Sequence, residues 1–459
     1  MNTTKKKEFD FNKEIKKESS PRSHFQKQGK KELIIFGLFI LSIVFLIFLW
    51  VSYKLIFIIN SIFIIYIFSV YFFLWSDYAS KKEVPPKLNY WPEVSIIIPS
   101  FNSSETIFKC IESCKNLSYP KKVEIIVVDD GSTDGSYEKL KEVKGIKLLK
   151  QPKNIGKAAS LNLGLRHAKG EIIACVDSDS YPKKDTLLNT VPYFYSNEKV
   201  GSVTVFIKVA NPRTLLQKMQ EIEYNISFGF FFKLIASIDC LYVTPGPMSL
   251  YSKKVFDEIG YFDEENITED MEIALRMQKN GWKIKRASNS LVYTEVPSTL
   301  SGLFKQRIRW FRGAIYNLIN YFDMLFNPRY KTLGLFILPL ILFSGFFTAI
   351  FFLWGIFNSF KVFLNFLFPL FMYTPAYFFQ FLSFYLSNMP LINSSLLLGF
   401  FGFLFWFFFS YKSFSIADDK IRHYHIPGFL LILFFYPLFI GFTFFSSYVL
   451  EFGGRKYKW

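Results

Sequence analysis

EIIACVDSDS, at residues 171–180, is a short apolar run that ends in two closely spaced aspartates, and EIIVVDDGSTDG, at residues 124–135, follows the same plan. A third β-rich run, VSIII, occupies residues 94–98. Segments with the helical spacing of apolar residues, 106–117 and 157–167, separate the three runs. This alternation of strand and helix predicts an α/β domain with a mainly parallel sheet.

The aspartates that end two of these strands are the first candidate site residues. Ligands of a parallel sheet bind beyond the carboxyl ends of its strands, so we expect Asp130, Asp177 and Asp179 near a ligand. Two aspartates two residues apart can form a hard oxygen site for Mg²⁺ or Mn²⁺, and such ions bridge phosphates, which favours a nucleoside diphosphate. The alternative for each motif is an ordinary turn in which the aspartate only caps local backbone.

Two further motifs follow the strands. Thr-Glu-Asp at residues 268–270 opens a helical run at 271–278, and its alternative role is an N-cap with acidic residues in the first turn. Gln-Arg-Ile-Arg-Trp at residues 306–310 lies in a basic, amphipathic segment, 303–326. That segment fits an interfacial helix with snorkelling arginines and an anchoring tryptophan, a role that is compatible with a functional one.

The composition indicates a membrane protein. Of the 459 residues 51% are hydrophobic and 58 are Phe, while 54 Lys+Arg against 37 Asp+Glu give a net charge of +17. A chain that is both this hydrophobic and this basic is more typical of a membrane protein with cytoplasmic basic regions than of a nucleic-acid binder. Residues 33–75 are apolar for long enough to form two spans, and the basic residues before them predict a cytoplasmic tail rather than a cleaved signal peptide. We therefore expect a multi-pass plasma-membrane protein with a cytoplasmic α/β domain.

Composition shifts divide the chain into six regions. We expect a basic cytoplasmic tail (1–31), two transmembrane helices (32–76), the α/β domain (90–298), an amphipathic interfacial segment (299–331), three or four transmembrane segments (332–450) and a short C-terminal tail (451–459). The last transmembrane region contains apolar runs at 333–356, 362–386, 396–409 and 429–450, of which the third is short. The four cysteines lack the spacing of a zinc site, which favours reduced, cytosolic thiols.

A family resemblance emerges from the motifs taken in order. They are VSIIIPSFN (94–102), VVDDGSTDGS (127–136), NIGKAASLN (154–162), VDSDS (176–180), TPGPMSLY (244–251), TED (268–270) and QRIRW (306–310). This set resembles the family 2 glycosyltransferases, specifically the membrane-embedded processive synthases of poly-N-acetylglucosamine, hyaluronan, chitin or cellulose. The resemblance implies a GT-A-type, Rossmann-like catalytic domain embedded between transmembrane helices.

The resemblance also implies a role for each candidate residue. Asp130 would bind the nucleobase, Lys157 would lie by the donor nucleotide, and Asp177 and Asp179 would hold the donor diphosphate through Mg²⁺ or Mn²⁺. Asp270 would be the catalytic base. Five further motif residues would contact the diphosphate and the acceptor sugar: Gly246, Glu269, Gln306, Arg309 and Trp310.

The expected function is inverting transfer of a sugar from a UDP-sugar, with UDP-N-acetylglucosamine favoured, to the end of a β-linked polysaccharide. Inversion follows because Asp270 is a single carboxylate with no candidate nucleophile near it in sequence. Export would be coupled to synthesis, with an accessory export protein as a further candidate partner. Polar or amphipathic residues that could line the export path are Tyr373, Tyr377, Gln380, Tyr385 and Asn388. The alternative is that the tyrosines belong to a membrane-interface belt and that Gln380 makes a helix–helix contact.

Two alternatives remain open at this point. One is transfer of a single sugar to a membrane lipid of the ceramide or polyprenyl phosphate type, in which case the acceptor is lipid-linked. The other is a non-catalytic membrane scaffold or transporter built on the same fold.

Overall fold

The computed structural model describes residues 53–79, 85–196, 198–372, 394–416 and 419–453, together with Tyr377, Phe379, Gln380, Ser383 and Phe384. The expected basic tail and the first of the two expected N-terminal spans lie outside the described residues. So do Tyr373, Tyr385 and Asn388 of the expected export path.

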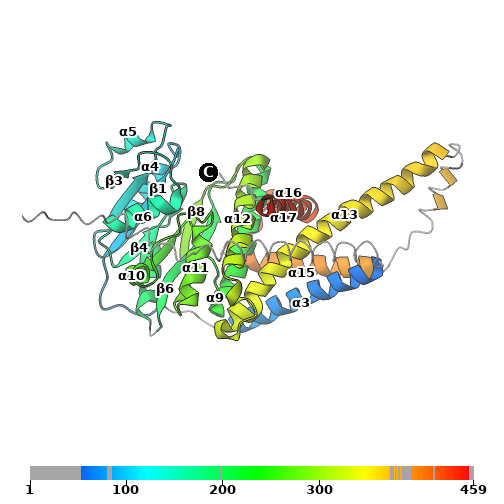
Figure 1. Ribbon diagram of the computed structural model, residues 1–459, viewed down its shortest axis with the longest axis horizontal. Helices are drawn as coiled ribbons and strands as arrows, with labels where there is room; N and C mark the ends of the chain where they lie inside the picture. The colour runs from blue at the N-terminus through cyan, green and yellow to red at the C-terminus, as the bar shows by residue number, and fades with distance from the viewer. Residues whose placement is uncertain are drawn as a thin grey trace, which may run out of the picture.

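An eight-stranded sheet organises the first half of the described chain (Figure 1). In sequence order its strands are β1 (Val94–Ser100), β2 (Glu124–Asp129), β3 (Lys147–Lys150), β4 (Ile172–Cys175), β5 (Ser180–Pro182), β6 (Val200–Val209), β7 (Ser249–Ser252) and β8 (Lys283–Thr294). Their order across the sheet is β3-β2-β1-β4-β7-β6-β8-β5. The first four strands in this order are mutually parallel, as predicted. Strand β7 runs antiparallel to β4 and β6, so the sheet as a whole is mixed.

Helices cover both faces of the sheet. In the soluble half they are α4 (Ile107–Lys115), α5 (Ser136–Leu140), α6 (Lys157–His167), α7 (Thr186–Thr190), α8 (Leu215–Tyr224), α9 (Phe232–Ser237), α10 (Lys253–Ile259) and α11 (Glu269–Lys279). Shorter helical segments are η1 (Val191–Tyr195) and η2 (Asn225–Phe231). Successive residues of β1 point to opposite faces: Ile97 packs in the core with α6 and α11, and Ile96 packs with α4. Each expected strand and helix of this half is present, because each has an apolar face to bury.

The helix α12 (Leu300–Asn320) stands between the sheet and the apolar helices (Figure 1). It is the expected amphipathic segment, and it is followed by the short turns η3 (Phe322–Met324) and η4 (Pro328–Tyr330). Thr299 caps its N-terminus by accepting a hydrogen bond from the Gly302 amide.

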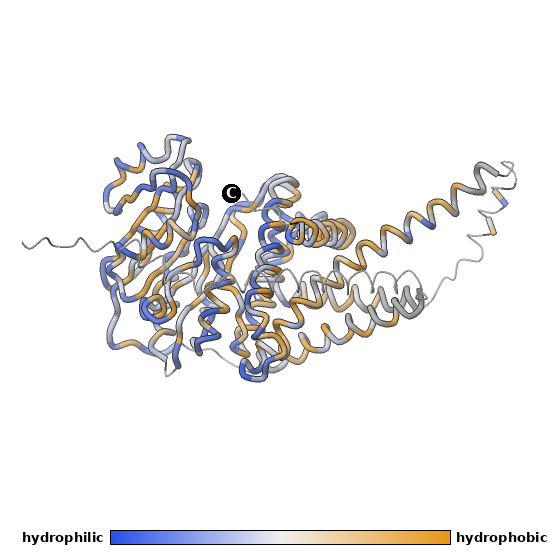
Figure 2. The backbone as a smooth tube through the Cα atoms, in the orientation of Figure 1, coloured by the Kyte–Doolittle hydropathy of each residue, from blue (hydrophilic) through white to orange (hydrophobic). Residues whose placement is uncertain are grey.

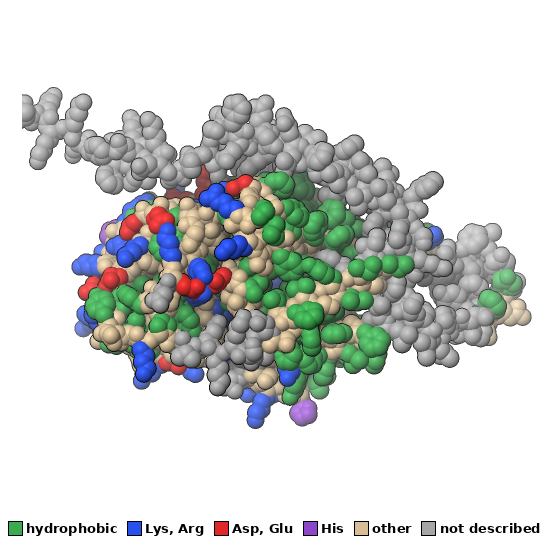
Figure 3. Space-filling view, turned by 90° about the horizontal axis from the view of Figure 1, so that it is seen from below, with side chains coloured by type: hydrophobic (Ala, Val, Ile, Leu, Met, Phe, Trp, Pro, Cys, Tyr) green, Lys and Arg blue, Asp and Glu red, His purple; other side chains and the backbone are tan. Residues whose placement is uncertain are grey.

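Long apolar helices form the other half of the molecule. They are α3 (Tyr53–Ala79), η5 (Leu333–Ile337) with α13 (Leu338–Met372), α15 (Ser394–Ile416), and the stretch η6 (His423–His425), α16 (Ile426–Leu430), η7 (Leu431–Phe435) and α17 (Tyr436–Phe452). Hydrophobic residues dominate these helices, and the charged side chains gather over the sheet domain (Figures 2 and 3). Within the described part of the chain, residues 333–361 and 423–452 are long and apolar enough to cross a membrane.

Two apolar runs differ from their expected lengths. The expected break between residues 356 and 362 is absent, because α13 continues to Met372; there Asn358 donates its side-chain amide to the carbonyl of Trp354, 2.9 Å away. The short apolar run 396–409 belongs to a longer helix, α15, of 23 residues. In it, Ser410 donates its hydroxyl to the Trp406 carbonyl. In both cases the polar side chain bonds to a carbonyl one turn earlier in its own helix, and the helix continues past it.

Candidate functional site

The turn after β2 fixes Asp130. Its two carboxylate oxygens accept hydrogen bonds from the backbone amides of Ile155 and Gly156, at 3.0 and 2.9 Å. Burial raises the pKa of Asp130, and those two hydrogen bonds oppose the rise. Gly131 has a φ of +74°, and a Cβ there would lie 2.7 Å from the Lys153 backbone, so the two loops meet at a distance that only glycine permits. Asp130 thereby anchors the loop that leads into α6.

The first residue of α6, Lys157, connects two of the acidic motifs. Its Nζ lies 2.5 Å from Oδ1 of Asp177, after β4, and 3.1 Å from Oε1 of Glu269, at the start of α11. Burial disfavours the charged form of Lys157, but the charges of Asp177, Glu269 and Asp270 outweigh it and raise its pKa. Lys157 is therefore a cation that holds the ends of α6, β4 and α11 together.

Gly246 covers this cluster. A Cβ on Gly246 would lie 2.5 Å from Nζ of Lys157 and 2.6 Å from Oδ2 of Asp177. Because residue 246 has no side chain, the backbone between Pro245 and Pro247 approaches the ion pair without displacing Lys157 or Asp177.

Asp179 lies beside the cluster and is held by the sheet. Its Oδ1 accepts a hydrogen bond from the Ser180 hydroxyl, 3.1 Å away, and its backbone carbonyl accepts one from the amide of Glu295. Burial, together with the nearby charge of Asp177, raises the pKa of Asp179 to about 6.

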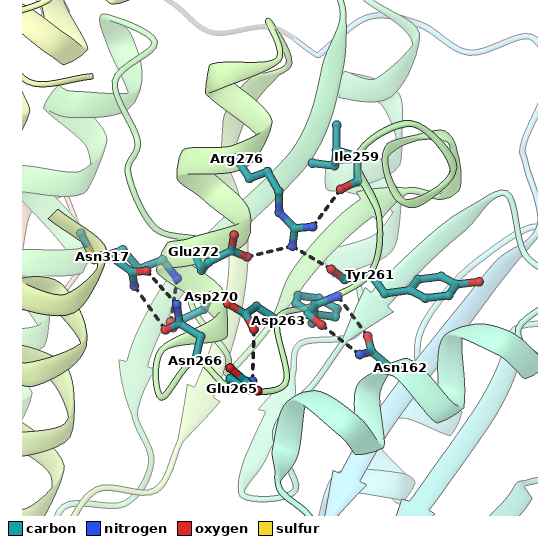
Figure 4. A network of polar contacts seen from close by, with 12 residues as sticks. Asn162, Ile259, Tyr261, Asp263, Glu265, Asn266, Asp270, Glu272, Arg276 and Asn317 are labelled. Atoms are coloured by element: carbon teal, nitrogen blue, oxygen red, sulfur yellow. Dashed lines mark hydrogen bonds and ion pairs between the residues drawn. The ribbon is translucent and has the colours of Figure 1, made fainter. Parts of the chain in front are cut away.

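The loop that precedes α11, and so leads to Asp270, is held by polar contacts from other helices (Figure 4). Asn162 of α6 donates to the Phe262 carbonyl and accepts from the Phe262 amide. Asn317 of α12 accepts from the side-chain amide of Asn266 and donates to Oγ1 of Thr268, at 2.8 and 3.0 Å. Thr268 occupies the N-cap position of α11, and Glu269 and Asp270 lie in the first turn, as the N-cap alternative expects, but the Thr268 side chain makes no capping bond.

Asp270 itself is partly buried at the start of α11. Burial, and then the charge of Glu269, raise its pKa to about 6, against the opposing charges of Lys157 and Arg309. A carboxyl group with this pKa is ionised at neutral pH and is a better base than an exposed aspartate.

A cavity of about 620 Å³ brings most of the candidate residues together. Those that line it are Lys157, Asp177, Asp179, Gly246, Glu269, Asp270, Gln306, Arg309 and Trp310. Asp130 does not line it. The cavity continues between α12, α13 and α17, where its walls include Ile341, Gly345, Phe444 and Tyr448. The exposed residues Tyr377 and Gln380 of the expected export path do not line it.

Residues 95–260 match the family model described as Glycosyl transferase family 2. They form a family 2 glycosyltransferase domain. This match confirms the predicted family resemblance, whereas the motifs at 268–270 and 306–310 lie beyond the matched residues.

Known relatives of the family 2 glycosyltransferase domain agree with this assignment. The chain is 32% identical over 248 residues to the poly-beta-1,6-N-acetyl-D-glucosamine synthase of Staphylococcus epidermidis, a match that covers 53% of this chain and 60% of the relative. It is 30% identical over 251 residues to the synthase of the same name from Staphylococcus aureus (strain COL), covering 54% and 61%. The chain thus spans about 60% of the length of these relatives.

The fold is also that of a solved glycosyltransferase. A mannosyltransferase from Pyrobaculum calidifontis, in complex with GDP-Man and Mn²⁺, superposes with a TM-score of 0.50 at 19% identity, over 82% of this chain and 98% of that one. The likeness confirms the predicted α/β fold of GT-A type.

The family 2 domain offers two carboxylates for a divalent cation, Asp177 and Asp179. Among the described residues there is no group of three or more His, Cys, Asp or Glu side chains arranged to hold a metal. Mg²⁺ is commonly held by one or two carboxylates together with substrate phosphates and water. The pair therefore fits an ion that shares its ligands with a diphosphate.

Three residues of the site were not expected from the sequence. Glu295 lines the cavity directly after β8, where the rule of carboxylates at strand ends could have found it. Glu223 of α8 also lines the cavity and forms an ion pair with Arg307. Arg307 lies inside the motif at 306–310, but the resemblance assigns it no role there, and no local pattern distinguishes Glu223 from an ordinary surface charge.

Proposed function

We propose that the protein is an inverting membrane glycosyltransferase that transfers a sugar from a UDP-sugar to the end of a growing β-linked polysaccharide. The observation that carries the proposal is that Asp177, Asp179, Asp270, Arg309 and Trp310 line the same cavity. This cavity continues among apolar helices. The names of the Staphylococcus relatives support N-acetylglucosamine as the sugar.

Asp270 is the proposed catalytic base. It takes the proton from the acceptor hydroxyl as that oxygen attacks the anomeric carbon of the donor, and the bond from this carbon to the diphosphate breaks. A single displacement inverts the anomeric configuration, so an α-linked donor gives a β-linked product. The positive charges of Lys157 and Arg309 act on this site and favour departure of the anionic diphosphate.

The donor-binding residues have separate tasks. Asp130, outside the cavity, is proposed to bind the nucleobase, and Gly246 lets the backbone approach the diphosphate. Mg²⁺ or Mn²⁺ on Asp177 and Asp179 would add electrostatic stabilisation of the leaving group. Glu269 and Gln306 line the same cavity, and both are proposed to contact the diphosphate and the acceptor sugar.

Synthesis coupled to export is part of the same proposal. The catalytic domain is cytoplasmic in this scheme, the apolar helices cross the plasma membrane several times, and the polymer leaves between α12, α13 and α17. An accessory export protein is a candidate partner.

The second candidate function is transfer of one sugar to a membrane lipid, of the ceramide or polyprenyl phosphate type. It is favoured by the apolar walls of the deep part of the cavity, formed by residues such as Leu318, Leu325 and Leu342, which suit an alkyl or prenyl chain.

A donor assay separates these functions. Purified protein is incubated with a panel of radiolabelled UDP-sugars and Mg²⁺ or Mn²⁺, and products are resolved by length. Polymer from one donor supports the first proposal, and a lipid carrying one or two sugars supports the second. Absence of transfer from every UDP-sugar of the panel would overturn both.

Export is tested in sealed vesicles with the donor outside. Polymer that is recovered inside and resists an added glycosidase supports coupled export, and polymer that stays outside contradicts it. The Asp270→Asn protein in matched vesicles controls for leakage.

A further inference from the structure

Arg307, inside the motif of residues 306–310, is the most buried large charged side chain of α12, with 1% of its surface exposed. Arg307 contacts two other residues of this motif, Gln306 and Trp310. Its Nη1 donates to Oε1 of Gln306 at 2.5 Å, and its guanidinium carbon lies 4.2 Å from the centroid of the Trp310 ring.

The guanidinium position limits how Trp310 can bind a sugar. A planar guanidinium at 4.2 Å covers one face of the indole ring. Trp310 lines the cavity, so the opposite face or the ring edge is left for a sugar. The contact also restricts rotation of the Trp310 side chain, and the bond to Gln306 restricts that neighbour in the same way.

Arg307 is itself held by groups from two other helices. Its Nη2 lies 2.6 Å from Oε2 of Glu223 on α8, and its Nε donates to the hydroxyl of Tyr436 on α17 at 3.2 Å. Each of the three side-chain nitrogens of Arg307 thus donates a hydrogen bond, which limits its freedom to move, and removing only one partner of a buried ion pair is strongly destabilising.

We propose that Arg307 is a positioning residue for the acceptor: it fixes Trp310 and Gln306 in the cavity and ties their orientation to α8 and α17. The inference rests on the proposed glycosyl transfer. It assigns Arg307 no contact with the donor, because Arg307 is buried and does not line the cavity.

The principal test replaces the whole ion pair. Arg307→Met combined with Glu223→Leu removes both charges, so no buried charge is left unpaired and the fold should survive. Arg307→Lys is the second variant, since lysine keeps the charge beside Glu223 but cannot stack on Trp310 and donate to Gln306 with the same planar group.

A matched control exists on the same helix. Arg312 of α12 lies 2.9 Å from Glu451 at the end of α17, and neither residue lines the cavity. Arg312→Met combined with Glu451→Leu removes a second buried link between α12 and α17 without touching Gln306 or Trp310.

The measurements separate positioning from folding. For both Arg307 variants we expect UDP affinity within about twofold of wild type, while the KM for a β-linked N-acetylglucosamine oligomer rises or its kcat falls by about 10-fold to 100-fold. The ratio of sugar transferred to UDP released should also fall. The Arg312–Glu451 variant should keep the wild-type acceptor KM.

Two results would overturn the positioning role. One is a wild-type acceptor KM and kcat in both Arg307 variants. The other is an equal loss in the Arg312–Glu451 variant, which would mean that helix packing alone is responsible. If the wild-type protein transfers sugar to no acceptor, the proposed function itself has failed, and that outcome is distinct from either of these.

Discussion

Nζ of Lys157 lies 2.5 Å from Oδ1 of Asp177. The same Nζ lies 3.1 Å from Glu269, next to the proposed base Asp270. A single cation therefore links the strand end that is proposed to bind the donor diphosphate with the helix start that is proposed to activate the acceptor. The start of α6, the end of β4 and the start of α11 meet at this cation. Substitutions in these segments should therefore affect donor binding and sugar transfer separately.

Replacing Asp270 by Asn should abolish transfer and spare donor binding. The amide keeps the size of the carboxylate but cannot accept the acceptor proton, and loss of a general base costs roughly 10²-fold to 10⁴-fold in rate. The rate is measured with radiolabelled donor and UDP affinity by calorimetry. Asp257→Asn, at an exposed position on α10, is the control. A rate above about a tenth of wild type would exclude Asp270 as the base.

Replacing Asp177 or Asp179 by Ala should remove metal-dependent UDP binding together with activity, because each would supply an oxygen ligand to the ion. UDP affinity is measured with Mn²⁺ and again with excess EDTA, and Asp257→Ala serves as the control. Equal UDP affinity with and without EDTA in the wild-type protein would show that the two aspartates do not form a metal site.

The pH dependence of transfer should carry an acid limb near pH 6. Burial and the charge of Glu269 raise the pKa of Asp270 to about 6, and the base works only when it is ionised. The rate should therefore be on its plateau above about pH 7 and fall as pH drops through 6. An exposed aspartate would place this limb about two units lower. A rate that stays flat down to pH 5 contradicts the prediction.

Gly313→Ala should displace the loop before Asp270. A Cβ on Gly313 of α12 would overlap Oγ1 and Cγ2 of Thr268 and lie 2.7 Å from its Cβ. Overpacking of this kind costs about 1–3 kcal/mol. We expect a lower Tm and a lower transfer rate, whereas Gly355→Ala in α13, where a Cβ meets no atom within 4 Å, should change neither. Equal behaviour of the two variants would rule out the close contact.

Local sequence determined the strands and helices of the sheet domain and the positions of its aspartates at strand ends. The strand β2 and the helix α6 begin and end within a residue of the expected positions, because side-chain periodicity reflects which face is buried. Asp130, Asp177 and Asp179 follow strands, so their placement at one edge of a parallel sheet follows from connectivity alone.

Tertiary structure decided which of these residues share a cavity and what holds them there. Arg307 bonds to Glu223, 84 positions away, and to Tyr436, 129 positions away. Neither partner is marked by a local pattern, because such pairs are selected by how α8, α12 and α17 pack rather than by periodicity within any one of them. The unbroken length of α13 has a different, local origin: Asn358 donates its side-chain amide to the Trp354 carbonyl of the same helix, so a polar residue in an apolar run leaves the helix intact.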